Sequence, residues 1–146
     1  MKLLKDIMKN QLSENASVLI IGNEILSGRT IDKNFNFIAS KLNEHGISIS
    51  ESRTVSDNEQ EIINAINELR KKYNYVFTTG GIGPTHDDVT AESISKAFNV
   101  ELEINEEAYK ILEDYYKELG SEFNDVRQRM ARIPKGASLI KNDISA

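Results

Sequence analysis

The segment from Val76 to Thr90 constrains the fold of this chain more than any other stretch. It begins as an apolar run typical of a buried strand, passes through three glycines, and closes on two adjacent aspartates and a threonine. A helical pattern from Ala91 to Phe98 follows directly. In open α/β sheets, ligands bind beyond the carboxyl ends of the strands. This order of strand, glycine loop, acidic pair and helix therefore predicts a ligand site at such a strand end.

The glycines and aspartates of this segment indicate which ligand chemistry it suits. Gly80, Gly81 and Gly83 carry no side chain, so their backbone N–H groups can approach a phosphate or another anion. Asp87 and Asp88 supply hard oxygen ligands of the kind that hold Mg²⁺ beside substrate phosphates. The alternative is a tight turn whose aspartates cap the next helix. The combination of residues favours the ligand loop and predicts a metal site at the two aspartates.

The spacing of apolar residues on the N-terminal side of this segment predicts an α/β fold. Residues 17–21 and 75–79 have the pattern of short buried strands, and residues 47–55 alternate in part like a strand with one wetter face. Helical spacing separates these strands, the first helix beginning near residue 34. The second helix is expected after a capping box of Ser56 and Glu59. This order is typical of a mostly parallel sheet with helices on both faces.

Beyond residue 98 the spacing predicts smaller elements and no second domain. We expect a short strand within 100–104, a helix over 108–119, a short helix over 126–133 and another strand at 138–140. The chain is interpreted as one domain over 17–146, preceded by an N-terminal extension of residues 1–16. Since the chain stops directly after the last candidate strand, we expect this domain to be incomplete at its C-terminal end.

The composition excludes several classes of function. The 146 residues contain no cysteine, which removes thiol catalysis and disulfides, and only two histidines, which argues against a histidine-rich zinc site. A formal net charge of −5 without a basic stripe argues against nucleic acid as the main partner. No apolar run is long enough to span a bilayer, and the first residues lack a signal-peptide pattern. We therefore expect a cytoplasmic protein without a membrane partner.

Two further carboxylates follow the other two predicted strands. Glu24 comes just after the first strand and Asp57 after the second, so both are expected at the same edge of the sheet as Asp87 and Asp88. Four carboxylates at one edge raise each other's pKa, which favours either a bound cation or one protonated acid that acts in catalysis. The alternatives are a solvated loop glutamate for Glu24 and a helix cap for Asp57.

Other polar residues offer hydrogen bonds or positive charge to a ligand. Thr85 and Thr90 can orient ligand oxygens, and His86 is a candidate general base or phosphate donor, although a lone loop histidine is more often neither. The arginines at 127, 129 and 132 can clamp a phosphate or simply form a solvated helix face. The glycine loop lacks the Lys-Ser/Thr ending of a Walker P-loop, which excludes ATP hydrolysis by that route.

Three sequence motifs together resemble a known family. They are Gly22-Asn23-Glu24-Ile25-Leu26-Ser27-Gly28, Asp57-Asn58, and the run from Thr79 to Thr90 with its pattern GGxGPTxDD. These motifs resemble the molybdopterin-binding (MoaB/MogA-like) domain, in the subgroup formed by the amino-terminal domain of competence/damage-inducible protein A. A late stretch with Asn124, Arg127 and Pro134-Lys135-Gly136-Ala137 also fits this subgroup.

The resemblance implies a three-layer α/β/α domain, often a homo-oligomeric trimer, with its site around the glycine loop. Two functional interpretations remain open. The subgroup is associated with hydrolysis of ADP-ribose and related nucleotide diphosphates by a divalent cation (Mg²⁺ or Co²⁺), with Asp87, Asp88, Glu24 and Asp57 as catalytic candidates. Other relatives bind molybdopterin or adenylylate it, or present the pterin without turnover. The ligand-binding residues expected in either case are Gly22, Asn23, Ser27, Gly28, Thr79, Gly80, Gly81, Gly83, Pro84, Thr85, His86, Thr90 and Arg127.

Overall fold

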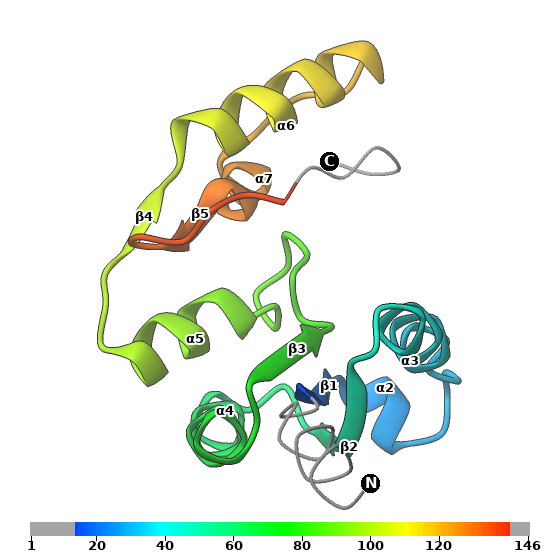
Figure 1. Ribbon diagram of the computed structural model, residues 1–146. Helices are drawn as coiled ribbons and strands as arrows, with labels where there is room; N and C mark the ends of the chain where they lie inside the picture. Colours follow the sequence, from blue (N-terminus) through cyan, green and yellow to red (C-terminus); the bar gives the residue numbers. More distant parts are fainter. Residues whose placement is uncertain (1–13, 141–146) are drawn as a thin grey trace, which may run out of the picture.

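A three-stranded parallel sheet with the order β2-β1-β3 lies at the centre of the computed structural model, which describes residues 14–140 (Figure 1). β1 (Asn15–Ile21) is flanked by β2 (Ser48–Val55) and β3 (Tyr75–Thr79). All β1 residues from Ala16 to Ile21 are buried, as expected for a central strand that is covered on both faces. Because the strands are parallel, their carboxyl ends meet at one edge of the sheet.

Helices cover both faces of this sheet and give a three-layer α/β/α arrangement (Figure 1). α2 (Asn23–Leu26) and α3 (Asn34–Glu44) connect β1 to β2, and α4 (Glu59–Lys72) connects β2 to β3. The two crossovers run in opposite directions across the sheet. Since such crossovers are right-handed, α3 and α4 lie on opposite faces. α5 (Thr90–Phe98) packs beside α4. The mostly parallel sheet and the three layers predicted from the sequence are confirmed.

The main hydrophobic core lies between β1 and α4. Leu19 and Ile21 on one face of β1 pack against the apolar stripe of α4, whose members recur at helical spacing. The buried α4 residues are Ile62, Ala65, Ile66 and Leu69, and Ala97 of α5 completes the cluster.

The start of α4 differs from the sequence-based expectation. Asn58, not Ser56, is the N-cap: its side chain accepts hydrogen bonds from the backbone N–H groups of Gln60 (3.0 Å) and Glu61 (3.1 Å). The Ser56 hydroxyl instead donates to the Glu61 carboxylate at 2.6 Å. The predicted capping box of Ser56 and Glu59 is therefore wrong, because the helix begins one residue after Asn58.

The rest of the chain forms a small unit beside α5 (Figure 1). Its centre is a two-stranded antiparallel sheet in which Leu102 pairs with Pro134 and Ile104 with Arg132. Its elements are β4 (Leu102–Ile104), α6 (Glu106–Glu118), α7 (Asp125–Gln128), the 3₁₀ helix η1 (Arg129–Ala131) and β5 (Arg132–Pro134).

Two predictions for the chain ends can be compared with this fold. The predicted strand at 138–140 is wrong: these residues form no regular structure, and the strand that pairs with β4 ends at Pro134. Of the predicted extension 1–16, residues 1–13 lie outside the described residues, whereas Asn15 and Ala16 belong to β1. Within residues 14–140, none of the helices has the length and apolar character that crossing a membrane requires.

Candidate functional site

The glycine loop leaves β3 with a backbone conformation that requires glycine. Gly80 and Gly81 have φ values of +94° and +59°, a region that other residues adopt only with strain. A Cβ atom on Gly80 would lie 1.9 Å from the carbonyl oxygen of Ile21 in β1. The loop therefore approaches the end of the central strand so closely that a side chain at this position has no room.

Thr90 holds the loop from the first turn of α5. Its hydroxyl donates to the Gly80 carbonyl at 2.9 Å, and its backbone N–H donates to the Gly81 carbonyl at 3.1 Å. The side chain is almost completely buried. Thr90 therefore positions the loop, and its hydroxyl proton is already used, so the expectation that it orients ligand oxygens is replaced by a structural role.

Asp88 is fixed by Thr85 and faces the interior of the loop. The backbone N–H of Thr85 donates to the Asp88 carboxylate at 2.9 Å, and the Thr85 hydroxyl donates to the same oxygen. That oxygen lies 2.7 Å from where a Cβ atom on Gly83 would stand. Gly83 thus leaves the space that the Asp88 carboxylate occupies.

Asp87 differs from its neighbour in exposure and surroundings. Its side chain is exposed, and the nearby Thr85 hydroxyl holds the pKa of the Asp87 carboxyl below its ordinary value, helped by the residue's own backbone N–H. Asp87 is therefore ionised at neutral pH, and His86 beside it is also exposed.

A cavity of about 230 Å³ opens beside this loop and connects three parts of the fold. Gly81, Gly83 and Asp88 line it from the loop, the first turns of α5 line it from a second side, and η1 with β5 supplies a third wall. Arg129 and Arg132 stand on this third wall. The cavity therefore combines bare backbone, the carboxylates of Asp88 and Glu92, and two guanidinium groups.

The arginine expected to bind the ligand points elsewhere. The Arg127 guanidinium stacks over the ring of Tyr116 at 4.3 Å from its centroid and donates to the carbonyl of Glu122. Arg127 does not line the cavity, whereas Arg129 and Arg132 do. Local spacing gave no signal for this choice, because Arg132 lies on β5 and reaches the cavity through the pairing of β5 with β4.

The four carboxylates share one edge of the sheet but do not form one cluster. Within residues 14–140, no group of three or more His, Cys, Asp and Glu side chains is placed to hold a metal ion. Asp57 accepts a hydrogen bond from the Asn23 backbone N–H at 2.8 Å, and the Glu24 carboxylate folds over Gly22. The expected single cluster of Glu24, Asp57, Asp87 and Asp88 is therefore not found in the described residues: Asp57 is bonded to the start of α2, and Glu24 lies beside Gly22.

The first motif is organised around α2, and none of its residues lines the cavity. Gly22 donates its N–H to the Val55 carbonyl at 3.1 Å, and the Ser27 hydroxyl donates to the Glu24 carbonyl at 3.2 Å. The sequence-predicted ligand residues that do not line the cavity are Gly22, Asn23, Ser27, Gly28, Thr79, Gly80, Pro84, Thr85, His86 and Arg127. Gly81, Gly83, Asp88 and Thr90 do line it.

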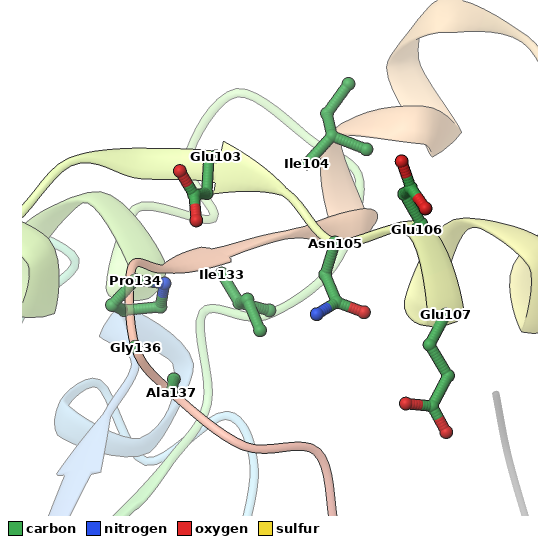
Figure 2. Close-up of a pocket in the computed structure, with 9 residues that line it drawn as sticks. All are labelled: Glu103, Ile104, Asn105, Glu106, Glu107, Ile133, Pro134, Gly136 and Ala137. Atoms are coloured by element: carbon green, nitrogen blue, oxygen red, sulfur yellow. The ribbon is translucent and has the colours of Figure 1, made fainter.

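A second cavity, of about 280 Å³, lies between β4, β5 and the start of α6 (Figure 2). Two of its polar side chains, Asn105 and Glu103, already have partners within the fold. Asn105 caps α6 by accepting from the Ala108 N–H at 2.9 Å, and Glu103 lies 3.6 Å from the Lys135 ammonium group. Although larger, this cavity has no guanidinium group and is lined by three glutamates, which repel an anion, so the candidate site is the one at the glycine loop.

A family model described as "Probable molybdopterin binding domain" matches residues 17–140, which include the sheet, the glycine loop and both arginines of the cavity. The chain belongs to this family. Among solved structures, this molybdopterin-binding domain is similar to the protein CinA, of unknown function, from Thermoplasma acidophilum. The identity is 35%, the TM-score is 0.81, and the match covers 91% of this chain and 78% of that chain. The domain is therefore of the CinA type.

Two further comparisons show how far the similarity extends. The tungsten cofactor synthesizing protein MoaB from Pyrococcus furiosus is 28% identical with a TM-score of 0.56, covering 75% of this chain and 66% of that chain. A protein from Sulfurisphaera tokodaii is 42% identical over 129 residues, which is 88% of this chain and 49% of that protein. The chain thus spans about half the length of this relative.

Proposed function

We propose that this CinA-type domain binds a nucleotide diphosphate of the ADP-ribose class at the glycine loop and hydrolyses its diphosphate bond with the help of a divalent cation. The observation that carries the proposal is the cavity at the carboxyl end of the parallel sheet, where the backbone of Gly81 and Gly83 and the carboxylate of Asp88 face one space. Glycine backbone beside a helix N-terminus suits phosphate groups. The cavity is small, so the nucleoside and ribose parts would extend beyond it.

The residues of the loop fit a cation that the substrate helps to hold. Mg²⁺ is usually bound through one or two carboxylates together with substrate phosphates and water, and does not require an all-protein cage. Asp88 faces the cavity and Asp87 is adjacent and ionised, so these two residues would hold Mg²⁺ or Co²⁺. A bound cation would neutralise charge on the phosphates and lower the pKa of a water molecule.

The remaining roles follow from the contacts within the loop. Thr85 keeps the Asp88 carboxylate turned toward the cavity, and Thr90 fixes the backbone that would face the phosphate. Asp57 supports the start of α2, and neither Asp57 nor Glu24 lines the cavity, so the proposed reaction does not use them. In the reaction, the oxygen of water forms a bond to one phosphorus, and the bridging P–O bond of the diphosphate breaks. The products are AMP and ribose 5-phosphate.

Product formation tests this proposal. Purified protein is incubated with ADP-ribose and Mg²⁺ or Co²⁺, and AMP is measured by chromatography. We expect AMP to form with the cation, to disappear when it is chelated, and to be lost in Asp88→Asn without a large change in thermal midpoint. If no AMP forms with either cation, the hydrolase proposal is wrong. If Asp88→Asn mainly unfolds the domain, the Asp88 carboxylate has only a structural role in the loop through its bonds to Thr85.

Binding or adenylylation of molybdopterin is the second candidate function. Two observations favour it: the family model itself, and the similarity to a MoaB protein of tungsten cofactor synthesis. A pterin phosphate monoester presents the same anionic group to the glycine loop. Tight pterin binding without AMP release from ADP-ribose would support a binding module, whereas an adenylylated pterin formed from ATP would support the transferase.

A further inference from the structure

One glutamate and two arginines form a charged cluster on the wall of the cavity beside α5. The Glu92 carboxylate accepts a hydrogen bond from Arg132, and Nη2 of Arg129 lies 3.5 Å from the same oxygen. All three residues line the cavity that Gly81 and Gly83 also line. We call this group the Arg129–Glu92–Arg132 cluster.

The cluster has more hydrogen-bond donors than the fold uses. Each guanidinium group has five N–H donors, and a single carboxylate cannot satisfy two of them. In the described part of the chain, Nε of Arg132 is buried without a hydrogen-bond partner. The side chains of Arg129 and Arg132 keep 37% and 32% of their area exposed. Donors are therefore available for an anion beside the cluster.

The charges that line the cavity are balanced but unevenly placed. Asp88 contributes one negative charge on the loop side, and the cluster carries two positive charges and one negative. A dication at Asp88 would make the loop side positive as well. A ligand with negative charge at two neighbouring positions, as in a diphosphate, would then be matched on both sides.

We propose that Arg129 and Arg132 bind the second phosphate group of a diphosphate whose first phosphate lies at the glycine loop, while Glu92 positions the two guanidinium groups before the ligand arrives. This inference rests on the proposed function and extends it, because it assigns the two phosphates to different walls of the cavity. A paired guanidinium set suits phosphate oxygens, since planar N–H groups bind them bidentately. Glu92 is a positioning residue that also competes with the ligand for the same donors.

The alternative is that the cluster only links α5 to β5 structurally. The two roles differ in the expected affinities: in a binding role, loss of an arginine weakens ligand binding and loss of the Glu92 charge strengthens it. The measurement is calorimetric binding of inorganic pyrophosphate in the presence of Mg²⁺, together with the thermal midpoint of each variant. Arg132→Gln should weaken binding at least about tenfold, the size expected for one lost charge-assisted contact. Glu92→Gln removes the competing charge and keeps an oxygen of similar shape, so binding should tighten.

The matched control is Arg127→Gln, which removes an arginine of the same segment that does not line the cavity and should leave the affinity unchanged. Should Arg132→Gln fail to fold, Arg129→Gln decides, because the bond of Arg132 to Glu92 remains and a weaker affinity is still expected. The inference is overturned if Arg129→Gln and Arg132→Gln bind pyrophosphate as tightly as the wild type, or if Arg127→Gln loses as much affinity as they do. In either case, pyrophosphate binding by the wild type still supports the proposed function. Absence of pyrophosphate binding by the wild type overturns both.

Discussion

Replacing Gly80 by alanine tests whether the approach of the glycine loop to β1 shapes the site. A Cβ atom at Gly80 would stand 1.9 Å from the Ile21 carbonyl oxygen. Contacts below 3.0 Å essentially do not occur for real Cβ atoms, so the loop or the strand must move by at least 1.1 Å (3.0 − 1.9). Ile21 belongs to the buried core and cannot yield easily. The loop is therefore the part that must shift.

The size of the effect follows from two separate costs. A side chain at positive φ costs about 1–2 kcal/mol, and forcing extra volume into a packed region costs roughly 1–3 kcal/mol more. Gly46→Ala is the matched control, because Gly46 has φ +76° but nothing within 4 Å of the added atom. We expect Gly80→Ala to lose about 2–5 kcal/mol and Gly46→Ala only about 1–2 kcal/mol.

Urea unfolding monitored by circular dichroism measures the free energy of unfolding of Gly80→Ala and of Gly46→Ala. For a chain of this size, each kcal/mol corresponds to a shift of roughly 3 °C in the thermal midpoint, so scanning calorimetry gives an independent value. Equal losses of stability in Gly80→Ala and Gly46→Ala would refute the reasoning. That result would mean that the close contact with Ile21 can relax without cost.

Three further predictions concern the frame that supports the site. Asn58→Ala removes the N-cap of α4 and should lower the free energy of unfolding by about 1 kcal/mol, measured by urea titration; no loss would show that the cap is dispensable. Leu69→Ala deletes a fully buried side chain from the core and should cost about 3–5 kcal/mol in the same assay, and a cost below 1 kcal/mol would contradict the described packing. Hydrogen bonds from Arg53 lower the pKa values of Glu51 and Glu68 below the ordinary 4.5. A carboxyl group whose pKa is lower in the folded state than in the unfolded state stabilises the fold at any pH above its unfolded-state pKa. This stability is lost as the pH falls through its folded-state pKa. The thermal midpoint should therefore decrease as the pH is lowered through about 4.5, and it should decrease less steeply in Arg53→Gln than in the wild type. Parallel plots of midpoint against pH for the two proteins would contradict this.

Local patterns in the sequence were sufficient for the sheet and the loop. Short β-branched runs such as Val18–Ile21 are typical of buried parallel strands, and the glycines at 80 and 81 occupy the positive-φ positions of the loop. Both signals lie within a few neighbouring residues. The succession of strands and helices along the chain, and the edge of the sheet at which the loop lies, follow from them.

The third wall of the cavity depends on pairing between distant segments, which local patterns do not reveal. β5 reaches the loop because Leu102–Ile104 pairs with Arg132–Pro134. Each strand has only three residues, so no periodic pattern in the sequence predicts this pairing. The sequence motif therefore favoured Arg127, and the fold selects Arg129 and Arg132. Glu92 was missed for the same reason, since its partners lie on η1 and β5.

The sequence also did not predict the directions of the Glu24 and Asp57 side chains at the edge of the sheet. Glu24 follows β1, the neighbour of β3, and Asp57 follows β2 at the same edge of the sheet, which made convergence with Asp88 a reasonable expectation. The folded chain directs them elsewhere, because Asp57 accepts a hydrogen bond from the N–H of Asn23, 34 residues away in the sequence, and the Glu24 carboxylate lies over Gly22.

Gly83→Ala tests most directly whether the glycine loop and Asp88 form the working site. The added methyl group would meet the Asp88 carboxylate at 2.7 Å, and this flexible side chain can turn away while the charge is kept and the fold remains intact. The measurement is AMP release from ADP-ribose with Mg²⁺, alongside the thermal midpoint. We predict a large loss of turnover with a nearly unchanged midpoint. Full turnover in the folded variant would contradict the central claim that a correctly directed Asp88 carboxylate beside the loop performs the function.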